Sequence, residues 1–501
     1  MSVNTTWITG ALFWCTVLLA LTLTTSACGR KDSGGNDPAP APPVDEPAGG
    51  DGDATPGDGG IAPDEPAGGE GDEPDTGGET PGPGPVDEAP GNPDIPAGGE
   101  TQPPTPEEPD PDGSQPGEDD QAVAPEDQAC PVTPYGGRRA LLEHLGRGVI
   151  APLAGQFRDE VSRFRRTVDD TCAAGAAIDF AAAQSGWLAV NRLWQELEPL
   201  RVGPLAENND ALRFAISSWP QRNPCGTDRE VARARQAGAA YVLPPYPNRK
   251  GMTAAEYLLF DDPDHGCSAA VPDTKDWNTL PVAERMLRRC SYLSLVATDL
   301  EEQATLLRDA WDPAAGDYTA GWIGKGVDQA FTEVYQALYF LDKDMKDEKL
   351  AGPAGIAVNG RAACPTGICP DKLEGGLSRS SREALLANSR AIRSAFTGNP
   401  ANCATDRINQ GIQAELAAVG AADKGRQFLD ALDGFIDRLS ASEVSLWDLA
   451  VAMGNQACTP GDERELCLLH GDLKQVTDLF KNDMRGALGV APPARAAGDN
   501  D

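Results

Sequence analysis

Glu256 is the residue of this sequence whose chemistry most needs an explanation. The stretch KGMTAAEYLLFDD, which begins at Lys250, places apolar residues at helical spacing and sets one carboxylate, Glu256, among them. Core packing gives no reason for an acid at this position, because a buried carboxylate must find a partner. Glu256 is therefore a candidate for binding a metal ion or another ligand. The alternative is a structural role, in which Glu256 forms a buried ion pair or hydrogen bond between helical bundles, for example with an arginine.

Histidine, the usual partner of a carboxylate in a transition-metal site, is scarce. The chain contains only His144, His265 and His470, so a histidine-rich site requires that they converge. His265 follows Glu256 by nine residues, beyond Pro263, and a returning loop would bring it back to that carboxylate. We therefore treat His265 as a candidate metal ligand; the alternative is a solvated loop histidine. His144, off the apolar stripe of the first helix, and His470, in an expected turn, are predicted to lie at the surface.

The sequence lacks the common catalytic motifs. It contains neither His-Glu-x-x-His nor Gly-x-Ser-x-Gly, and GWIGKG does not have the spacing of a phosphate-binding loop. Nucleic acid is not expected as a partner, because the chain carries a net charge of −35 and offers no basic patch for phosphates.

Residues 1–27 predict a lipoprotein signal peptide. The run ITGALFWCTVLLALTLTTSACG is apolar over about the length of a secretory signal and ends in small residues before Cys28, the expected lipidation site. An uncleaved transmembrane anchor is the alternative, and both export the rest of the chain. We expect a cell-envelope protein bound to the membrane through its N-terminal lipid. Gly29 after the cysteine favours the outer membrane, with the folded part in the periplasm or on the cell surface.

Residues 28–129 predict a disordered tether. The segment from Gly29 to Gln128 consists mainly of Pro, Gly, Asp and Glu, and it cannot bury enough apolar surface to offset the entropy of ordering. It holds 27 acidic residues against Arg30 and Lys31, so most of the negative charge of the protein belongs to this segment. A self-repelling, extended spacer is the expected role.

The cysteines agree with export. Once Cys15 and Cys28 are set aside, ten remain, and an even number in an oxidising compartment predicts disulfides. Cys364 with Cys369 and Cys458 with Cys467 each flank a short loop and are plausible pairs. A zinc site is the alternative for Cys364 and Cys369, although no second close pair accompanies them.

The part of the chain from about residue 130 predicts helices throughout, without alternating strand patterns. One stripe contains Leu142, Leu145, Val149, Leu153, Phe157, Val161, Phe164 and Val168, and Pro152 should bend this helix. Further helices are expected at 187–197, 286–311 and 327–345, and later ones centre on residues 392, 412, 432, 449 and 476. The predicted fold is all-α, with two packed antiparallel bundles at 130–350 and 351–501. The Gly/Pro/Cys-rich stretch 350–376 is the expected boundary.

Several segments resemble the imelysin family. GWLAVNRLWQELEPLRVGP followed by RFAISSWP is similar to its first helical hairpin, and DEKLAGPAGI to its Lys-Leu-x-x-Pro-Leu-Gly segment. LEGGLSRSSREALLANSRAIRSAFTG resembles its Glu-Ser-x-Phe-Ser-x-x-Ser segment and the helix after it, and LKQVTDLFKNDMRGALGV its last helix. These matches follow the family order over nearly all of the expected folded part.

The resemblance assigns a role to the opening stretch. The family signature Gly-x-His-x-x-Glu falls on Gly251 to Glu256, with Thr253 in place of the histidine. His and Glu three residues apart on a helix share one face and can bind one metal ion, but a threonine hydroxyl is a weak substitute for imidazole. The resemblance also implies that Glu374 faces the same cleft. We interpret Ser378 or Ser380 as a helix N-cap, which leaves Glu374 as the better site candidate.

Two functions remain open at this stage. The resemblance implies a non-catalytic envelope protein linked to iron acquisition, which holds a metal ion, iron or another divalent cation, or a small ligand between the bundles and acts with envelope iron-uptake components. The alternative is a metallopeptidase, because the family has also been classed with peptidases, or a family member with a purely structural role. Since a zinc hydrolase needs about three protein ligands, the loss of the histidine favours binding without catalysis.

Overall fold

The computed structural model describes residues 134–494, apart from 176–177, 265, 360, 362–363, 365–366 and 400–409. The expectations for the signal peptide (1–27), for lipidation at Cys28 and for the tether (28–129) lie outside the described residues. The candidate ligand His265 lies outside them as well. All described residues belong to one unit, Asp112–Asp501.

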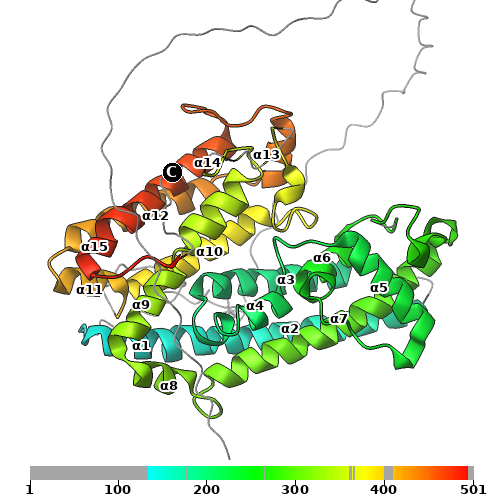
Figure 1. Ribbon diagram of the computed structural model, residues 1–501, viewed down its shortest axis with the longest axis horizontal. Coiled ribbons are helices and arrows are strands. Elements are labelled where there is room, and N and C mark those ends of the chain that lie inside the picture. Colours follow the sequence, from blue (N-terminus) through cyan, green and yellow to red (C-terminus); the bar gives the residue numbers. More distant parts are fainter. Residues whose placement is uncertain are drawn as a thin grey trace, which may run out of the picture. The chain divides into compact units, whose positions relative to one another are not determined.

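The first group of helices is built on two long helices that pack against each other. It comprises α2 (Ala151–Ala173), α3 (Ala181–Leu197), α4 (Ala211–Ile216), α5 (Pro224–Ala237), α6 (Gly251–Phe260) and α7 (Val282–Trp311). Helix α2 packs against α3 and α7, and α6 packs against both α3 and α7 (Figure 1). The predicted stripes supply this contact, because Phe157 and Val161 of α2 and Leu293 and Leu300 of α7 are fully buried.

The second group lies C-terminal in the chain. It comprises α10 (Ser381–Thr397), α11 (Ile412–Ala418), α12 (Ala422–Ser440), α13 (Leu446–Ala452), α14 (Glu465–Asp478) and α15 (Arg485–Leu488). Helix α12 packs against α10, α11 and α14, around an aromatic centre in which the ring of Phe428 lies 4.5 Å from that of Phe396 and 6.1 Å from that of Phe480. Helix α10 also packs against α3, which joins the two groups (Figure 1).

The other α-helices of the described ranges are α1 (Gly137–His144), α8 (Tyr318–Lys325) and α9 (Val327–Ala337). Helix α1 packs against both α8 and α9. Within the described ranges the protein contains helices and one isolated bridge but no strand, so the all-α prediction with two packed bundles is confirmed. The boundary at residue 350 stays a prediction. None of the helices in the described ranges combines the length and the hydropathy needed to cross a bilayer.

Among the described residues, three helical segments have π winding, and two of them change the predicted elements. The turn before Pro152 is the π-helix Leu145–Ile150, which follows α1 and leads into α2. Proline has no N–H to donate to the preceding turn, and π winding accommodates the missing bond without ending the helix. The single helix predicted over 327–345 is wrong: α9 ends at Ala337, and the π-helix η9 (Leu341–Ala351) follows. Segment η9 packs against α14. The third π segment, Leu479–Met484, continues α14.

Four disulfides lie in the described part of the chain: Cys172–Cys290, Cys225–Cys267, Cys364–Cys369 and Cys458–Cys467. The two local pairs are those expected from the sequence, and the zinc alternative for the first of them is wrong because its sulfurs are bonded to each other. The two long-range pairs were not predicted. The remaining cysteines, Cys130 and Cys403, lie outside the described residues.

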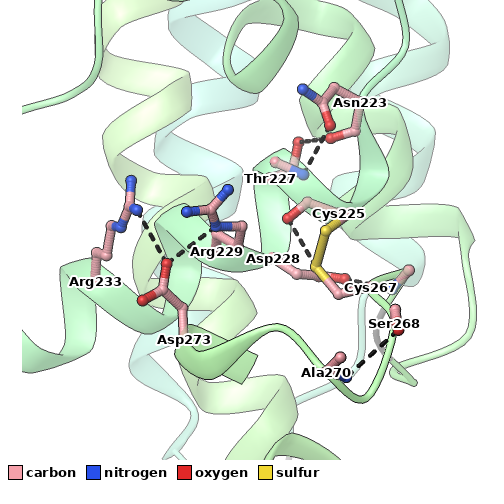
Figure 2. Close-up of a disulfide and its surroundings, with 12 residues drawn as sticks. Asn223, Cys225, Thr227, Asp228, Arg229, Arg233, Cys267, Ser268, Ala270 and Asp273 are labelled. Carbon is pink, nitrogen blue, oxygen red and sulfur yellow. Dashed lines mark hydrogen bonds and ion pairs between the residues drawn. A yellow bond between two sulfur atoms is a disulfide. The ribbon is translucent and has the colours of Figure 1, made fainter. Parts of the chain in front are cut away.

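The Cys225–Cys267 disulfide fastens the loop after α6 to the start of α5 (Figure 2). The same loop is held a second time where the carboxylate of Asp273 lies 3.0 Å from guanidinium nitrogens of both Arg229 and Arg233. These contacts fix the C-terminal end of α6, the helix that carries the candidate site.

Candidate functional site

The first residue of helix α6, Gly251, has to be a glycine because a side chain would not fit there. Gly251 has a φ of +66°, and a Cβ would lie 2.6 Å from the carbonyl oxygen of Ile216 and 2.7 Å from that of Ala215. Backbone atoms cannot yield to such a contact, and residues with a Cβ rarely adopt this conformation. The indole Nε1 of Trp187 donates to the carbonyl oxygen of Met252 at 3.1 Å. The glycine of the motif therefore lets the helix begin close against the chain that leads out of α4.

Glu256 is buried and accepts hydrogen bonds from the turn before α10. Its Oε1 accepts hydrogen bonds from the backbone N–H of Ser378 at 3.0 Å and from the hydroxyl of Ser378 at 2.9 Å. Only 5% of Glu256 is exposed. In the structural role considered for Glu256, this residue forms an ion pair or a hydrogen bond between the bundles. The contact found is a hydrogen bond. The donors are neutral, so they satisfy the carboxylate oxygen without supplying a compensating charge.

The surroundings favour the neutral acid at Glu256. Burial raises the pKa of Glu256 above its ordinary value of 4.5, while the charge of Arg222 and the hydrogen bonds from Ser378 act in the opposite direction. Because the folded-state pKa lies above the unfolded one, Glu256 contributes stability that is fully present below pH 4.5 and is lost as pH rises through the folded-state pKa. The protein therefore keeps this carboxylate at a cost in stability near neutral pH.

We expect Glu256→Gln to raise the free energy of unfolding at pH 8, with the gain shrinking toward zero at pH 4. Glutamine keeps the oxygen that accepts from Ser378 and removes the charge that burial disfavours. Urea unfolding of wild type and variant at pH 4, 6 and 8 measures the difference. Glu443→Gln, at an exposed glutamate, is the control and should show no such trend. A variant that is less stable than wild type at pH 8 but not at pH 4 would contradict this account.

Thr253 lies one turn before Glu256 on the same face of α6. It is 9% exposed, and its Oγ1 lies 3.5 Å from the Oγ of Ser217, which follows α4. The position that the family signature gives to histidine is therefore inside the protein, beside a second hydroxyl. Both groups offer neutral oxygen atoms, which are weak ligands for transition metals.

Glu374 belongs to a buried network of charges. Its Oε2 lies 2.6 Å from the Nζ of Lys349, which is also 3.1 Å from Oε2 of Glu198. Lys349 donates further hydrogen bonds, each of 2.8 Å, to Oε1 of Gln195 and Oδ1 of Asn388. The network continues through Glu198, whose Oε1 lies 2.8 Å from Arg213. Its two acids and two bases balance in formal charge, which makes their joint burial tolerable.

The charges of this network shift one another's pKa. Burial would raise the pKa of Glu198, but Lys349 and Arg213 hold it below its usual value. Burial also raises the pKa of Glu374, and there Lys349 compensates only in part. Burial would lower the pKa of Lys349, yet Glu198 and Glu374 hold it above its usual value. Lys349 therefore stays charged, and Glu374 is the acid that the network stabilises less as an anion.

A small cavity lined by buried residues brings the candidate residues together. The space open to the centre of a water molecule measures about 10 Å³, which is room for about one water molecule. It is lined by Trp187, Asn191, Ser217, Trp219, Met252, Thr253, Glu256, Glu374 and Gly375. The structure thus places Thr253, Glu256 and Glu374 around one space. The family resemblance implied this arrangement for Glu374 and the Gly251–Glu256 motif.

The serine residues before α10 do not act as the sequence suggested. Ser380 occupies the N-cap position of α10, but no side chain caps this helix. Ser378 binds Glu256, and the hydroxyl of Ser381 donates to the carbonyl oxygen of Glu374. The capping interpretation is therefore wrong. Sequence reasoning missed Ser378 as the partner of Glu256, because a serine near a helix start is usually explained by capping.

The histidines lie apart from this cavity wherever they are described. His265 is outside the described residues; of its neighbours, Asp264 pairs with Arg285 of α7 at 2.7 Å, and the N–H of Gly266 donates to Asp228 of α5. His144 is half-buried, and its Nε2 lies 2.6 Å from the carbonyl oxygen of Gly398. His470 lies within α14 and not in a turn.

The arrangement defines an all-α protein in which two helical groups meet at a small cavity lined by two carboxylates. A family model described as Imelysin (peptidase M75) matches residues 150–475. The chain therefore belongs to the imelysin family, and the resemblance seen in its motifs is confirmed. Curated proteins give no significant match.

Solved structures support the fold. An imelysin-like protein from Psychrobacter arcticum 273-4 aligns with a TM-score of 0.51 at 17% identity, over 71% of this chain and 96% of its own. A protein from Parabacteroides distasonis ATCC 8503, described as an iron-regulated protein A precursor, aligns with a TM-score of 0.52 at 16% identity, over 71% of this chain and 97% of its own. At these identities the likeness concerns the fold.

Proposed function

We propose that the protein is a non-catalytic binding protein of the cell envelope, linked to iron acquisition, which holds a small cation or another small ligand beside Glu256. The observation that carries the proposal is the cavity shared by Glu256 and Glu374, where Glu256 is kept although burial disfavours its charge. A site that costs stability is typical of function. The iron-regulated relative from Parabacteroides distasonis supports the link to iron.

The donor atoms favour one class of cation. The cavity offers carboxylate oxygens from Glu256 and Glu374 and hydroxyl oxygens from Thr253 and Ser217. Oxygen donors suit hard cations, whereas zinc and copper prefer imidazole and thiolate. The cavity lining in the described part contains neither of these two groups, and a zinc hydrolase uses about three protein ligands. Binding of a hard cation therefore fits the donors better than hydrolysis does.

The rest of the proposal concerns location. The lipoprotein signal in residues 1–27 would attach the protein to the outer membrane through Cys28, and the acidic segment would hold the folded part away from the lipid surface. Envelope iron-uptake components are the expected partners.

Metal titration tests the proposal. We expect wild type to bind ferric iron, the hardest of the four ions, more tightly than zinc or copper, and Glu256→Gln to lose binding by at least about tenfold while helix content stays the same. Thr253→His should strengthen binding, above all of zinc and copper, because it places an imidazole one turn from Glu256 on the same face. Calorimetric titration of each variant with the four ions measures this.

The control is Thr253→Leu, which changes the same buried position without adding a ligand, and unfolding curves show whether each variant is folded. Loss of binding in Glu256→Gln together with a gain in Thr253→His identifies a metal site. If neither wild type nor Thr253→His binds any of the four ions, the metal-binding function is wrong.

A further inference from the structure

Two spaces lie on either side of the turn that precedes α10. The inner one is the cavity of about 10 Å³ beside Glu256. The outer one is an open pocket of about 260 Å³ between α3 and α10, lined by Leu188, Asn191, Arg192, Ser378, Arg379, Ser380, Glu383 and Ala384. Asn191 lines both spaces, and Ser378 lines the outer pocket while it binds Glu256. The turn Ser378–Ser380 is therefore the partition between them.

The other walls of the inner cavity are much harder to move. Trp187 and Met252 are each 2% exposed and Trp219 is 4% exposed, so an opening through them would break the core. Glu374 is held by its ion pair with Lys349. In contrast, Ser378 is only half-buried and Arg379 is exposed. A path through the turn disrupts the least packing.

A directed chain of hydrogen bonds closes this partition. A serine hydroxyl has one hydrogen to donate. If Ser378 donates to Glu256 at 2.9 Å, then Ser380 donates to Ser378 at 2.8 Å, and the amide of Asn191 donates to Ser380 at 3.3 Å. The hydroxyl of Ser378 also lies 3.2 Å from the carbonyl oxygen of Gly375, but its shorter bond is the one to the carboxylate, on which the chain ends. A ligand that binds Oε1 of Glu256 from the inner cavity therefore competes with the hydrogen bond from Ser378, which holds the turn in place.

The middle residue of the turn is strained and held from outside. Arg379 has a φ of +61°, a left-handed conformation that is unfavourable for a residue with a Cβ. Its guanidinium carbon lies 4.2 Å from the ring centroid of Trp447, at the start of α13, in a cation–π contact. The strained backbone favours release of the turn, whereas the contact with Trp447 holds the turn in place. A segment under two such opposing influences can adopt two states.

We propose that the Ser378–Ser380 turn is a gate, that the outer pocket is its vestibule, and that a small ligand reaches Glu256 when the turn swings away and the Ser378–Glu256 bonds break. The ligand class, a cation or a molecule small enough to pass one turn, rests on the proposed function. The Arg379–Trp447 contact keeps the turn closed. Asn191 of α3 also holds it, through the hydrogen bond to Ser380.

Hydrogen exchange of the full mature protein tests the gate without any ligand, by mass spectrometry of peptides that cover residues 373–381. In wild type, these amides should exchange faster than those of the central helix α7, which report global unfolding. Ser378→Ala removes a hydroxyl bond to Glu256 and Arg379→Ala removes the cation–π contact; each should speed exchange of the turn by about tenfold, and the turn should still exchange faster than α7. Arg426→Ala, an exposed arginine on α12, is the control and should change neither.

A second measurement links the gate to the ligand. Trp187 and Trp219 line the inner cavity, so their fluorescence reports arrival of a quenching ion, and stopped-flow mixing with cupric or ferric ions gives the rate. Ser378→Ala should raise this rate several-fold. If the turn exchanges only as fast as α7 in wild type and both variants, the gate is wrong. If ions bind but the rate of fluorescence quenching is the same in all variants, the outer pocket is not the route of entry. If no ion binds while the turn still opens locally, the proposed function fails and the gate stands.

Discussion

Replacing Lys349 with methionine is expected to lower the free energy of unfolding by about 3–5 kcal/mol, the usual cost of breaking a buried ion pair from one side. Methionine fills nearly the same space but leaves Glu374 without its cation and Glu198 with Arg213 alone. Oδ1 of Asn388 loses its donor as well, while Oε1 of Gln195 keeps only the bond from the amide of Asn388. Urea unfolding at pH 7 measures the loss.

The matched control is Lys424→Met, at a lysine that is 42% exposed and 3.9 Å from Asp483. Such surface pairs contribute about 0–1 kcal/mol, so little change is expected there. The deficit of Lys349→Met should shrink when Glu374→Gln is added, because the uncompensated charge is then removed. A loss below about 1 kcal/mol for Lys349→Met, or full additivity in the double variant, would show that this network does not hold the two helical groups together.

The second large effect is expected from the Cys172–Cys290 disulfide, which joins α2 to α7 across 118 residues of sequence. Replacing both cysteines with alanine should lower the free energy of unfolding by about 5 kcal/mol, because the unfolded chain regains the entropy of a long loop. The alanine pair at Cys364 and Cys369, which closes a separation of only 5 residues, is the control and should cost about 2 kcal/mol.

Urea unfolding of the oxidised proteins gives both values. Equal losses for the two pairs would indicate that local strain or packing, and not loop length, sets the contribution of the disulfides. A loss for the long-range pair that is smaller than for the local one would contradict the expectation outright.

The sequence alone determined the main helical stripes and the resemblance to the family. The stripe that contains Phe157 and Val161 and the stripe that contains Leu293 and Leu300 became the buried contact between α2 and α7, because helical periodicity is a local property that each segment carries by itself. Local spacing also identified the Cys364–Cys369 and Cys458–Cys467 pairs. The motif drew attention to Glu256 for the same reason, since an acid inside an apolar stripe is visible without any partner.

Only the tertiary structure decided what these residues contact. Ser378 and Glu256 are 122 positions apart and Lys349 and Glu198 are 151 apart, and no spacing rule links residues at such distances. The same limit explains why Ser378 was interpreted as a cap and why Cys172–Cys290 was not foreseen. A buried charge can be satisfied by any suitable group that folding brings near, so its partner depends on how the helices pack and not on the sequence that surrounds it.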